Sequence, residues 1–500
     1  MKILSYILVA FLFVSCRPSI PEDYAEIDGC LEMYPDYRGV TIPCNIAPLT
    51  FHIDEEADEF VTVMTVGEKQ MVLSGEDVVP SLEEWRELIA DGGKMTIDTY
   101  FENEHGWYKS ATWEVDIVED EIDQYLSYRL VHPGYILYDD LAIWQRDITS
   151  WDEQVIYDTR MASTDEKAQC INCHSFRNYD GREMQFHARA AFGGTIIVRD
   201  GKIDKVNLKT DSTISAGVYP AWHPTENLIA YSNNNTGQNF HTLDRDKVEV
   251  LDEASDMILY DVEKNMVYPV CVGTKEFECY PTWSPDGEWL YYSKADYAVE
   301  ATGEAVWDEL RRNYYRFKYN IVRRKFHSQT RSFGDEEMVL KADTMTSRYY
   351  QEAGLSATLP RFSPDGRYLV VTLASFGVFH IWHKDADIYQ IDTQTGEGRY
   401  MDGLNSREVE SYHSWSSNGR WMVVSSRRED GSYTRPYISY IDQDGRERRP
   451  FVLPQKNPLH NKQLQRSYNI PEFTKTPVEV TPQEIASRMK RDAVQARYYR

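Results

Sequence analysis

The chain has 500 residues, which is more than one ordinary hydrophobic core organises and predicts two or three domains. Its 54 Lys and Arg stand against 80 Asp and Glu, so the formal net charge is −26. That charge argues against nucleic acid or an anionic lipid surface as a partner, because both would be repelled. The 35 Tyr and 12 Trp are typical of β-rich architecture, in which half-buried aromatic rings cover pleated faces.

The N-terminus has the pattern of an export signal. Lys2 supplies a positive start, and residues 3–14 form an apolar run too short to span a bilayer, so cleavage is expected. The sequence Phe13-Val14-Ser15-Cys16 resembles a bacterial lipobox, although that pattern usually has Leu in place of Phe13. The resemblance implies a signal over 1–16, lipidated Cys16 as the first mature residue, and a polar tether over 17–33. The alternative is an ordinary secretory signal with Cys16 unmodified.

The remaining cysteines fit an oxidising compartment. Two pairs are close enough in sequence to form local disulfides, Cys30 with Cys44 and Cys271 with Cys279, but the sequence does not establish this connectivity. This leaves Cys16 for lipid and one closely spaced pair, Cys170 and Cys173, for other chemistry.

Residues 34–130 predict a small β-sandwich-type domain. Apolar and polar residues alternate with period two over 60–65, 94–100 and 111–117, as in half-buried strands. A capping box formed by Ser81 and Glu84 predicts one short helix that begins there. No constellation of catalytic type stands out in this part of the sequence.

A connector over residues 131–183 contains the most specific motif of the chain, Cys170-Ile171-Asn172-Cys173-His174. Two thiols three residues apart, followed at once by an imidazole, is the arrangement for covalent attachment of c-type haem. We therefore predict one haem c, with Cys170 and Cys173 carrying the thioethers and His174 as proximal iron ligand. Three alternatives stay open: a zinc site, which would need a second ligand pair that the sequence lacks; a redox dithiol; and a disulfide.

The distal haem ligand is less well defined by the sequence. His187 and Met184 follow closely enough to fold back over a ring, and we take His187 first and Met184 second. Histidines farther along the chain compete with them: His132, His223, His241, His380, His383 and His413.

An internal repeat decides the fold of the second half. Four segments align without gaps, each with an aromatic strand end, a Pro-Asp-Gly type turn and an apolar strand: residues 219–232, 280–293, 359–372 and 412–425. One hairpin of this kind cannot bury its apolar face alone, so the repeats predict a propeller or solenoid. The phrase Trp283-Ser-Pro-Asp-Gly287 resembles the TolB-like β-propeller repeat, which implies an all-β propeller over 184–470. The repeats are compatible with five to seven blades, of which we take six.

The ring needs a closing strand, either from the N-terminal region or from the tail after Pro454. The tail over 471–500 has a helix start at Thr481-Pro482-Gln483-Glu484.

Other chemical motifs are weak. His380 and His383 would lie on opposite faces of a regular strand, so we interpret them as part of a blade rather than a metal site. No G-x-S-x-G, H-E-x-x-H or Walker phosphate loop occurs, which removes the commonest hydrolase and nucleotide-binding functions.

Taken together, the lipobox, the haem motif and the four repeats resemble a family of exported Bacteroidota lipoproteins labelled TolB-like or cytochrome c biosynthesis proteins. The resemblance implies an envelope lipoprotein anchored to the outer membrane. From the haem motif, the exported cysteine pattern and the absence of other catalytic motifs, we expect it to transfer electrons or sense redox state and to dock a redox or envelope partner. The rival hypothesis is a haem-free TolB-like scaffold, with a disulfide between Cys170 and Cys173, that binds envelope proteins or peptides. An enzyme, such as a haem peroxidase, is the third and least favoured.

Overall fold

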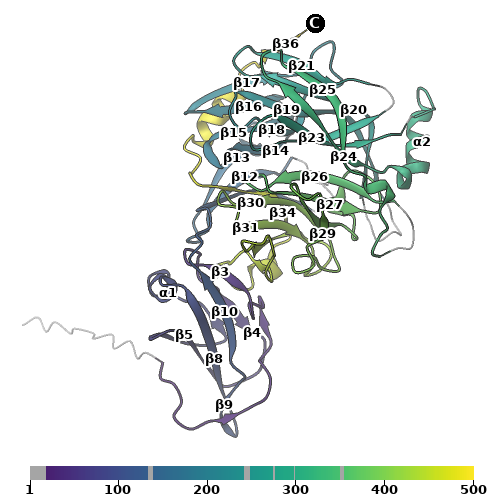
Figure 1. Ribbon diagram of the computed structural model, residues 1–500. Helices are drawn as coiled ribbons and strands as arrows, with labels where there is room; N and C mark the ends of the chain where they lie inside the picture. Colours follow the sequence, from purple (N-terminus) through teal and green to yellow (C-terminus); the bar gives the residue numbers. More distant parts are fainter. Residues whose placement is uncertain are drawn as a thin grey trace, which may run out of the picture.

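The computed structural model describes residues 18–132, 139–240, 248–273, 276–297, 299–349 and 354–499. Over these ranges the chain is built mainly from strands, with an N-terminal domain below a larger ring of sheets (Figure 1). The predicted signal and Cys16 lie outside the described residues, as does His241. Among the residues described, no helix has the length and apolarity needed to cross a bilayer.

The N-terminal domain contains two sheets and one helix. The predicted strands and the helix that begins at Ser81 are confirmed, and the Ser81 side chain accepts a hydrogen bond from the Glu84 backbone N–H. Phe51 and Trp113, one from each sheet, contact edge to face at 5.6 Å, which joins the sheets across an apolar core. The elements are β1 Ala25–Glu26, β2 Met33–Tyr34, β3 Thr41–Pro43, β4 Phe51–Ile53, β5 Glu59–Val66, β6 Lys69–Ser74, β7 Asp77–Val78, α1 Leu82–Ile89, β8 Gly93–Asn103, β9 Gly106–Lys109 and β10 Trp113–Val118.

Six further sheets of four or five strands follow. The first combines β11 Tyr125–Val131, β12 Ala142–Asp147 and β13 Glu153–Asp158 with β34 Ser467–Thr474. The second and third are β14 Gln169–Arg177, β15 Asp180–Ala190, β16 Gly194–Arg199 and β17 Lys202–Asn207, then β18 Val218–Trp222, β19 Leu228–Phe240, β20 Val248–Asp261 and β21 Met266–Cys271. The last three are β22 Phe277–Trp283, β23 Trp289–Ala295, β24 Asn320–His327 and β25 Ser332–Leu340; β26 Ser356–Phe362, β27 Tyr368–Ala374, β28 Asp387–Asp392 and β29 Gly398–Tyr400; and β30 Glu410–Trp415, β31 Trp421–Ser426, β32 Arg435–Tyr440 and β33 Phe451–Val452.

The six sheets form a closed, propeller-like ring. The first strands β14, β18, β22, β26 and β30 each contact the next, and β34 contacts both β30 and β14. Because β34 comes from the C-terminal tail and pairs antiparallel with β11, the two ends of the ring are joined within one sheet. The segment expected as a connector, 131–183, therefore carries β12, β13 and β14 of this ring.

The six innermost strands share one backbone feature. Each has a residue with a left-handed φ between 46° and 55°, and these residues are Cys173, Tyr219, Tyr280, Leu359, Tyr412 and Ile470. The strand register shifts at the same place in every sheet, so this residue and the next leave the ladder as a bulge. A left-handed non-glycine residue costs roughly 1–2 kcal/mol, and a bulge re-aims the side chains that follow it. Here the bulge points them at the axis of the ring.

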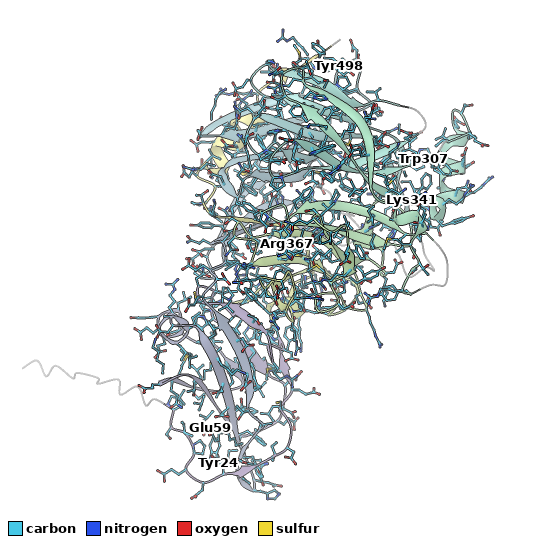
Figure 2. The ribbon with its side chains drawn as sticks, viewed as in Figure 1. Tyr24, Glu59, Trp307, Lys341, Arg367 and Tyr498 are labelled. Carbon is cyan, nitrogen blue, oxygen red and sulfur yellow. The ribbon has the colours of Figure 1, made fainter. Side chains whose placement is uncertain are left out.

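The N-terminal domain is joined firmly to the last sheet of the ring. Trp421 on β31 is fully buried in the core of that domain and donates its indole N–H to the Asp120 carbonyl at 2.9 Å. Asp123 accepts hydrogen bonds from the backbone N–H and the hydroxyl of Ser417, both at 2.6 Å. Figure 2 labels Tyr24 at the far end of this domain and Tyr498 at the opposite end of the molecule.

The C-terminal tail is packed along the ring. The helix predicted at Thr481 is confirmed as α4 Pro482–Met489, with the complete capping box. Two short strands then extend the second and third ring sheets in parallel, β35 Val494–Gln495 and β36 Arg497–Tyr498. The insertion after β23 contains α2 Ala305–Asn313, whose Trp307 is labelled in Figure 2. One further short helix, α3 His460–Gln463, precedes β34.

The two suggested disulfides are not formed in this structure, where the thiols of all four cysteines are free. Cys271 lies in the third ring sheet and contacts the Tyr292 hydroxyl at 3.3 Å, whereas Cys279 lies in the fourth and contacts Ser232. Cys30 and Cys44 contact different backbone carbonyls, those of Ala111 and Glu119. Proximity in sequence does not bring the sulfurs together, because each is held in its own strand or loop environment.

Candidate functional site

The Cys170–His174 motif is part of β14, an innermost strand of the ring. Cys173 and His174 form the bulge and occupy the positions that Tyr280 and Pro281 occupy in the fourth ring sheet. The motif is therefore a fifth copy of the repeated phrase, in which Cys-His replaces Tyr-Pro.

The two thiols of the motif lie in different surroundings. Cys170 packs against the apolar cluster between the first two ring sheets and lies 3.7 Å from the Asn172 amide. Cys173 is buried at the axis, where its thiol contacts the backbone of Tyr219. Burial raises the pKa of both thiols, so both stay protonated at neutral pH. The disulfide expected for this pair in the haem-free scaffold is absent as well, since both thiols are free.

His174 is buried, with 3% of its surface exposed. Within the described chain neither of its ring nitrogens has a well-formed hydrogen bond. Burial, reinforced by the charge of Arg129, lowers the pKa of His174 to about 3, so the ring is neutral. Such an imidazole has an unused lone pair, which is the one feature of this site that suits an iron ligand.

The space around the motif does not fit a porphyrin. The cavity lined by Cys173 and His174 measures about 30 Å³, which holds two or three waters at about 10–15 Å³ each. The side chains of Tyr219, Tyr280 and Tyr412 close the axis beside it. Pockets for drug-sized ligands measure about 300–1,000 Å³. Haem attachment would therefore require β14 and its neighbours to separate.

Neither predicted distal ligand lines the cavity at His174. His187 on β15 lies opposite Asn172 in the ladder, and its Nδ1 contacts the Thr195 hydroxyl at 3.1 Å. Met184 is fully buried opposite Phe176, in the apolar cluster between the first two ring sheets. Both side chains serve the packing of the second sheet.

The competing histidines also have local partners. His132 contacts Asp140 at 3.0 Å, His223 donates to the Gly287 carbonyl at 3.1 Å, and His413 donates to the Val370 carbonyl at 2.9 Å. These contacts give each ring a structural role in its own loop or sheet.

The predicted separation of His380 and His383 is wrong, because they lie in the short 3-10 helix η5 His380–Trp382 and its end rather than in a strand. Their rings approach to 5.5 Å between centroids. His380 contacts the Thr358 hydroxyl at 2.9 Å, and His383 pairs with the buried Glu249 carboxylate at 2.7 Å. Over the described ranges no group of three or more ligating side chains is arranged to hold a metal ion.

A larger cavity of about 270 Å³ opens on the axis at the turn end of the innermost strands. It exists because the residue two places after each left-handed position faces the axis, and four of these six side chains are small. The six residues are Ser175, Ala221, Thr282, Arg361, Ser414 and Glu472. Trp222, Trp283, Phe362 and Trp415 form its apolar walls.

Arg361 and Glu472 are the charged members of this set. Among the described residues the Arg361 guanidinium makes no hydrogen bond or ion pair, and its influence on Glu472 is through the field alone. One Glu472 oxygen accepts a hydrogen bond from the Phe176 backbone N–H at 3.1 Å, and the other, Oε2, is buried without a partner. Burial raises the pKa of Glu472 to about 7, against the lowering effect of Arg361.

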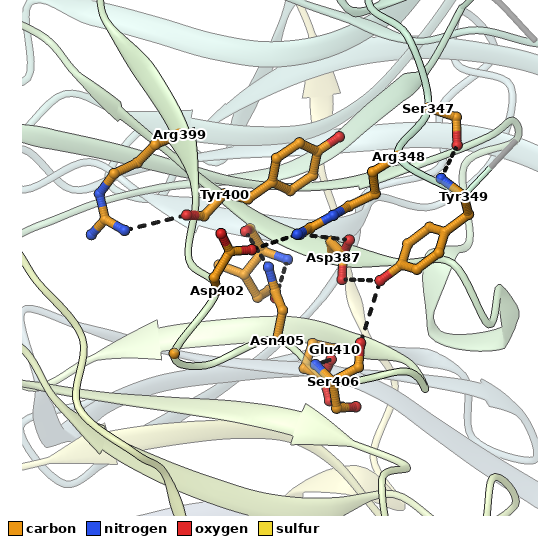
Figure 3. Close-up of polar contacts among 12 residues, drawn as sticks. Ser347, Arg348, Tyr349, Asp387, Arg399, Tyr400, Asp402, Asn405, Ser406 and Glu410 are labelled. Atoms are coloured by element: carbon orange, nitrogen blue, oxygen red, sulfur yellow. Dashed lines mark hydrogen bonds and ion pairs between the residues drawn. The ribbon is translucent and has the colours of Figure 1, made fainter. Parts of the chain in front are cut away.

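A second polar cluster differs from this one because its charges are paired (Figure 3). Arg348 binds Asp387 at 3.4 Å and Asp402 at 2.6 Å, and the Tyr349 hydroxyl donates to Asp387 at 3.2 Å. Glu410 nearby accepts from Ser406 and pairs with Arg428 at 3.1 Å. This cluster fastens the loop before β26 to the fifth and sixth ring sheets.

Sequence reasoning missed Arg361 and Glu472. The signal was present in the phrases Leu359-Pro-Arg-Phe362 and Ile470-Pro-Glu-Phe473, which carry the charged residues at the third position of the repeat.

No protein-family model and no curated protein matches this chain. Among solved structures, a 6-phosphogluconolactonase-like protein from Bacteroides fragilis is similar over 66% of this chain and 97% of its own, with 10% identity and a TM-score of 0.29. The tricorn protease is similar over 81% of this chain and 43% of its own, with 10% identity and a TM-score of 0.30. A GH43_12 protein from a capybara gut metagenome is similar over 67% and 61%, with 10% identity and a TM-score of 0.30.

Proposed function

We propose that the chain is an exported, lipid-anchored scaffold built on a six-bladed TolB-like propeller, which binds an envelope protein or peptide and carries no haem. The observation that carries the proposal is the place of the Cys170–His174 motif. Two of its five residues form the bulge of an innermost strand, with about 30 Å³ of space beside them. The closed ring of first strands supports the blade count, with β34 as the strand that closes it.

The architecture suits a scaffold better than a mobile electron carrier. The N-terminal domain follows the tether and shares a core with the ring through Trp421, so an anchor at Cys16 would hold one rigid body at the membrane. The ring then offers its axial end and its outer edges as binding surfaces. A two-domain rigid body presents a partner site in a fixed direction.

Haem attachment is the competing proposal, and the unused lone pair of His174 is the observation that favours it. The two proposals can be told apart by one measurement, because haem attachment requires thioether bonds at Cys170 and Cys173 and the haem-free scaffold has none.

The test uses the full chain expressed in a host with c-type cytochrome maturation machinery. We expect no absorbance in a pyridine haemochrome assay, an intact mass equal to the lipidated polypeptide, and alkylation of both Cys170 and Cys173 after denaturation. Covalent haem in the wild-type protein that disappears in Cys170→Ala would refute the scaffold and establish the cytochrome. Membrane fractionation of wild type and Cys16→Ser tests the anchor separately, and release of wild type into the soluble fraction would refute it.

A further inference from the structure

The axial cavity holds an arginine and a glutamate that do not pair with each other. Arg361 comes from β26 and Glu472 from β34, and β30 lies between these strands in the ring. The described residues give the guanidinium no partner, and Glu472 Oε2 none. Arg361 is half-buried and Glu472 Oε2 is buried, and native proteins normally pair or hydrogen-bond charged groups in such positions. Two such groups facing one cavity indicate a ligand that satisfies both.

The chemistry of the two groups defines the ends of that ligand. A guanidinium presents a planar fork that binds a carboxylate through two parallel hydrogen bonds. A carboxylate oxygen with free lone pairs accepts hydrogen bonds from an ammonium group. The hydroxyls of Ser175, Thr282 and Ser414 surround them at the same level of the ring. The complementary molecule is therefore a zwitterion.

The size and walls of the cavity limit what joins the two ends. About 270 Å³ lies just below the usual range for drug-sized ligands, about 300–1,000 Å³. Indole and phenyl faces from Trp222, Trp283, Phe362 and Trp415 line the cavity, and such faces favour an apolar or aromatic substituent. A single amino acid meets these limits, whereas a folded protein does not.

We propose that the axial cavity binds a free α-amino acid with an apolar side chain, whose carboxylate lies on Arg361 and whose ammonium lies on Glu472. The inference rests on the proposed function, since it gives the scaffold a ligand at its axis. It can fail independently, because the haem assay reads the Cys170–His174 motif and the binding assay reads the cavity.

The experiment is a thermal-shift screen of the full chain against each of the protein amino acids at millimolar concentration, followed by calorimetric titration. For an aromatic hit the matched probes are L-phenylalanine, L-phenylalaninamide, which lacks the carboxylate, and N-acetyl-L-phenylalanine, which lacks the ammonium. For an aliphatic hit the corresponding amide and acetyl derivatives are used. We expect the free amino acid to bind and each blocked probe to bind roughly 10–100-fold more weakly, as expected for loss of hydrogen bonds to a charged group.

Variants locate the site. Arg361→Gln and Glu472→Gln each should weaken binding of the free amino acid roughly 10–100-fold, and Glu472→Gln should bind L-phenylalanine and N-acetyl-L-phenylalanine with similar affinity, because the ammonium has lost its partner. Arg407→Gln and Glu479→Gln, which change exposed residues outside the cavity, should bind as wild type does. Three results would overturn the inference: no amino acid shifts the melting temperature, all three probes bind equally, or binding survives in Arg361→Gln.

Discussion

Replacing His174 with proline tests whether the haem-like motif is a copy of the repeat. Four of the six innermost strands already have proline at this place: Pro220, Pro281, Pro360 and Pro471. The residue before each of them has the same left-handed φ as Cys173, so the backbone at residue 174 is compatible with proline. His174→Pro should therefore fold.

The expected change in stability follows from what the substitution removes. Neither buried ring nitrogen makes a well-formed hydrogen bond, although the ring contacts the Ile470 backbone, and an unsatisfied buried polar group costs roughly 1–3 kcal/mol. Proline at a compatible site adds about 0.4–1 kcal/mol by restricting the unfolded chain. The lost packing of the imidazole offsets about 1 kcal/mol of this. The net gain is about 0.4–3 kcal/mol, which should raise the Tm by up to about 3 °C in differential scanning calorimetry.

His413→Pro is the matched control, because His413 occupies the same repeat position but donates a hydrogen bond to the Val370 carbonyl at 2.9 Å. That substitution leaves the carbonyl without its donor and should lower the Tm relative to His174→Pro. A fall of the His174→Pro Tm below that of wild type by more than about 2 °C would refute the repeat interpretation. It would show that the imidazole has a partner that stabilises the fold.

Three further predictions concern the rest of the molecule. Burial raises the pKa of Glu472 from 4.5 to about 7, so its contribution to stability is greatest below pH 4.5 and is lost as the pH rises through 7; the change is roughly 3 kcal/mol. Urea unfolding at pH 4.5 and pH 8 should show a loss of stability that is smaller by roughly 3 kcal/mol in Glu472→Gln than in wild type and Glu479→Gln, because Glu278, Asp387 and Asp252 also have raised pKa values and titrate in this range; an equal loss in all three proteins would contradict the assignment. Trp421→Ala should cost about 3–5 kcal/mol and expose the junction between the N-terminal domain and the ring to proteolysis; a variant as resistant as wild type would count against the shared core. A chain that ends before β34 should open the ring and aggregate through the exposed edge of β11, which gel filtration would detect; a soluble monomer with the wild-type Tm would exclude β34 as the closing strand.

The repeat carried most of the information that the sequence holds about this fold. The four aligned phrases predict antiparallel hairpins with fixed turn chemistry, and the structure has them at β18–β19, β22–β23, β26–β27 and β30–β31. The prediction succeeds because each phrase encodes its own turn, with glycine at a left-handed φ where the turn requires it, as at Gly287. Local signals of this kind depend little on the rest of the chain.

Two copies of the repeated phrase were not recognised in the sequence, one because it looks like a haem motif and the other because no hairpin turn follows it. In the second ring sheet Cys173-His174 replaces Tyr-Pro, and a cysteine pair followed by histidine has a stronger chemical association than a strand signal. In the first ring sheet Ile470-Pro471-Glu472 lies at the end of the chain and has no hairpin turn after it. Its partner β11 is more than 300 residues away, and such a pairing leaves no local trace in the sequence.

His380 and His383 show a second limit of predicting structure from sequence patterns. The alternation over 380–383 predicts that His380 and His383 face apart, but alternation holds only for an extended chain. A single 3-10 turn brings the two rings within 5.5 Å. The choice between strand and turn is made here by tertiary packing against Glu249 of β20, which lies more than 100 residues earlier.

The contrast between the two charged clusters is the strongest argument that the axial cavity is functional. Where charge fastens a loop, the chain pairs it fully, as Arg348 does with Asp387 and Asp402. At the axis the same chain holds Arg361 and Glu472 apart, although moving either charge to position 414 on β30 would bring them into neighbouring strands. Local rules of charge pairing are broken mainly at functional sites, where a ligand supplies the missing partner. In a chain selected for stability alone, we would expect Arg361 and Glu472 to form an ion pair.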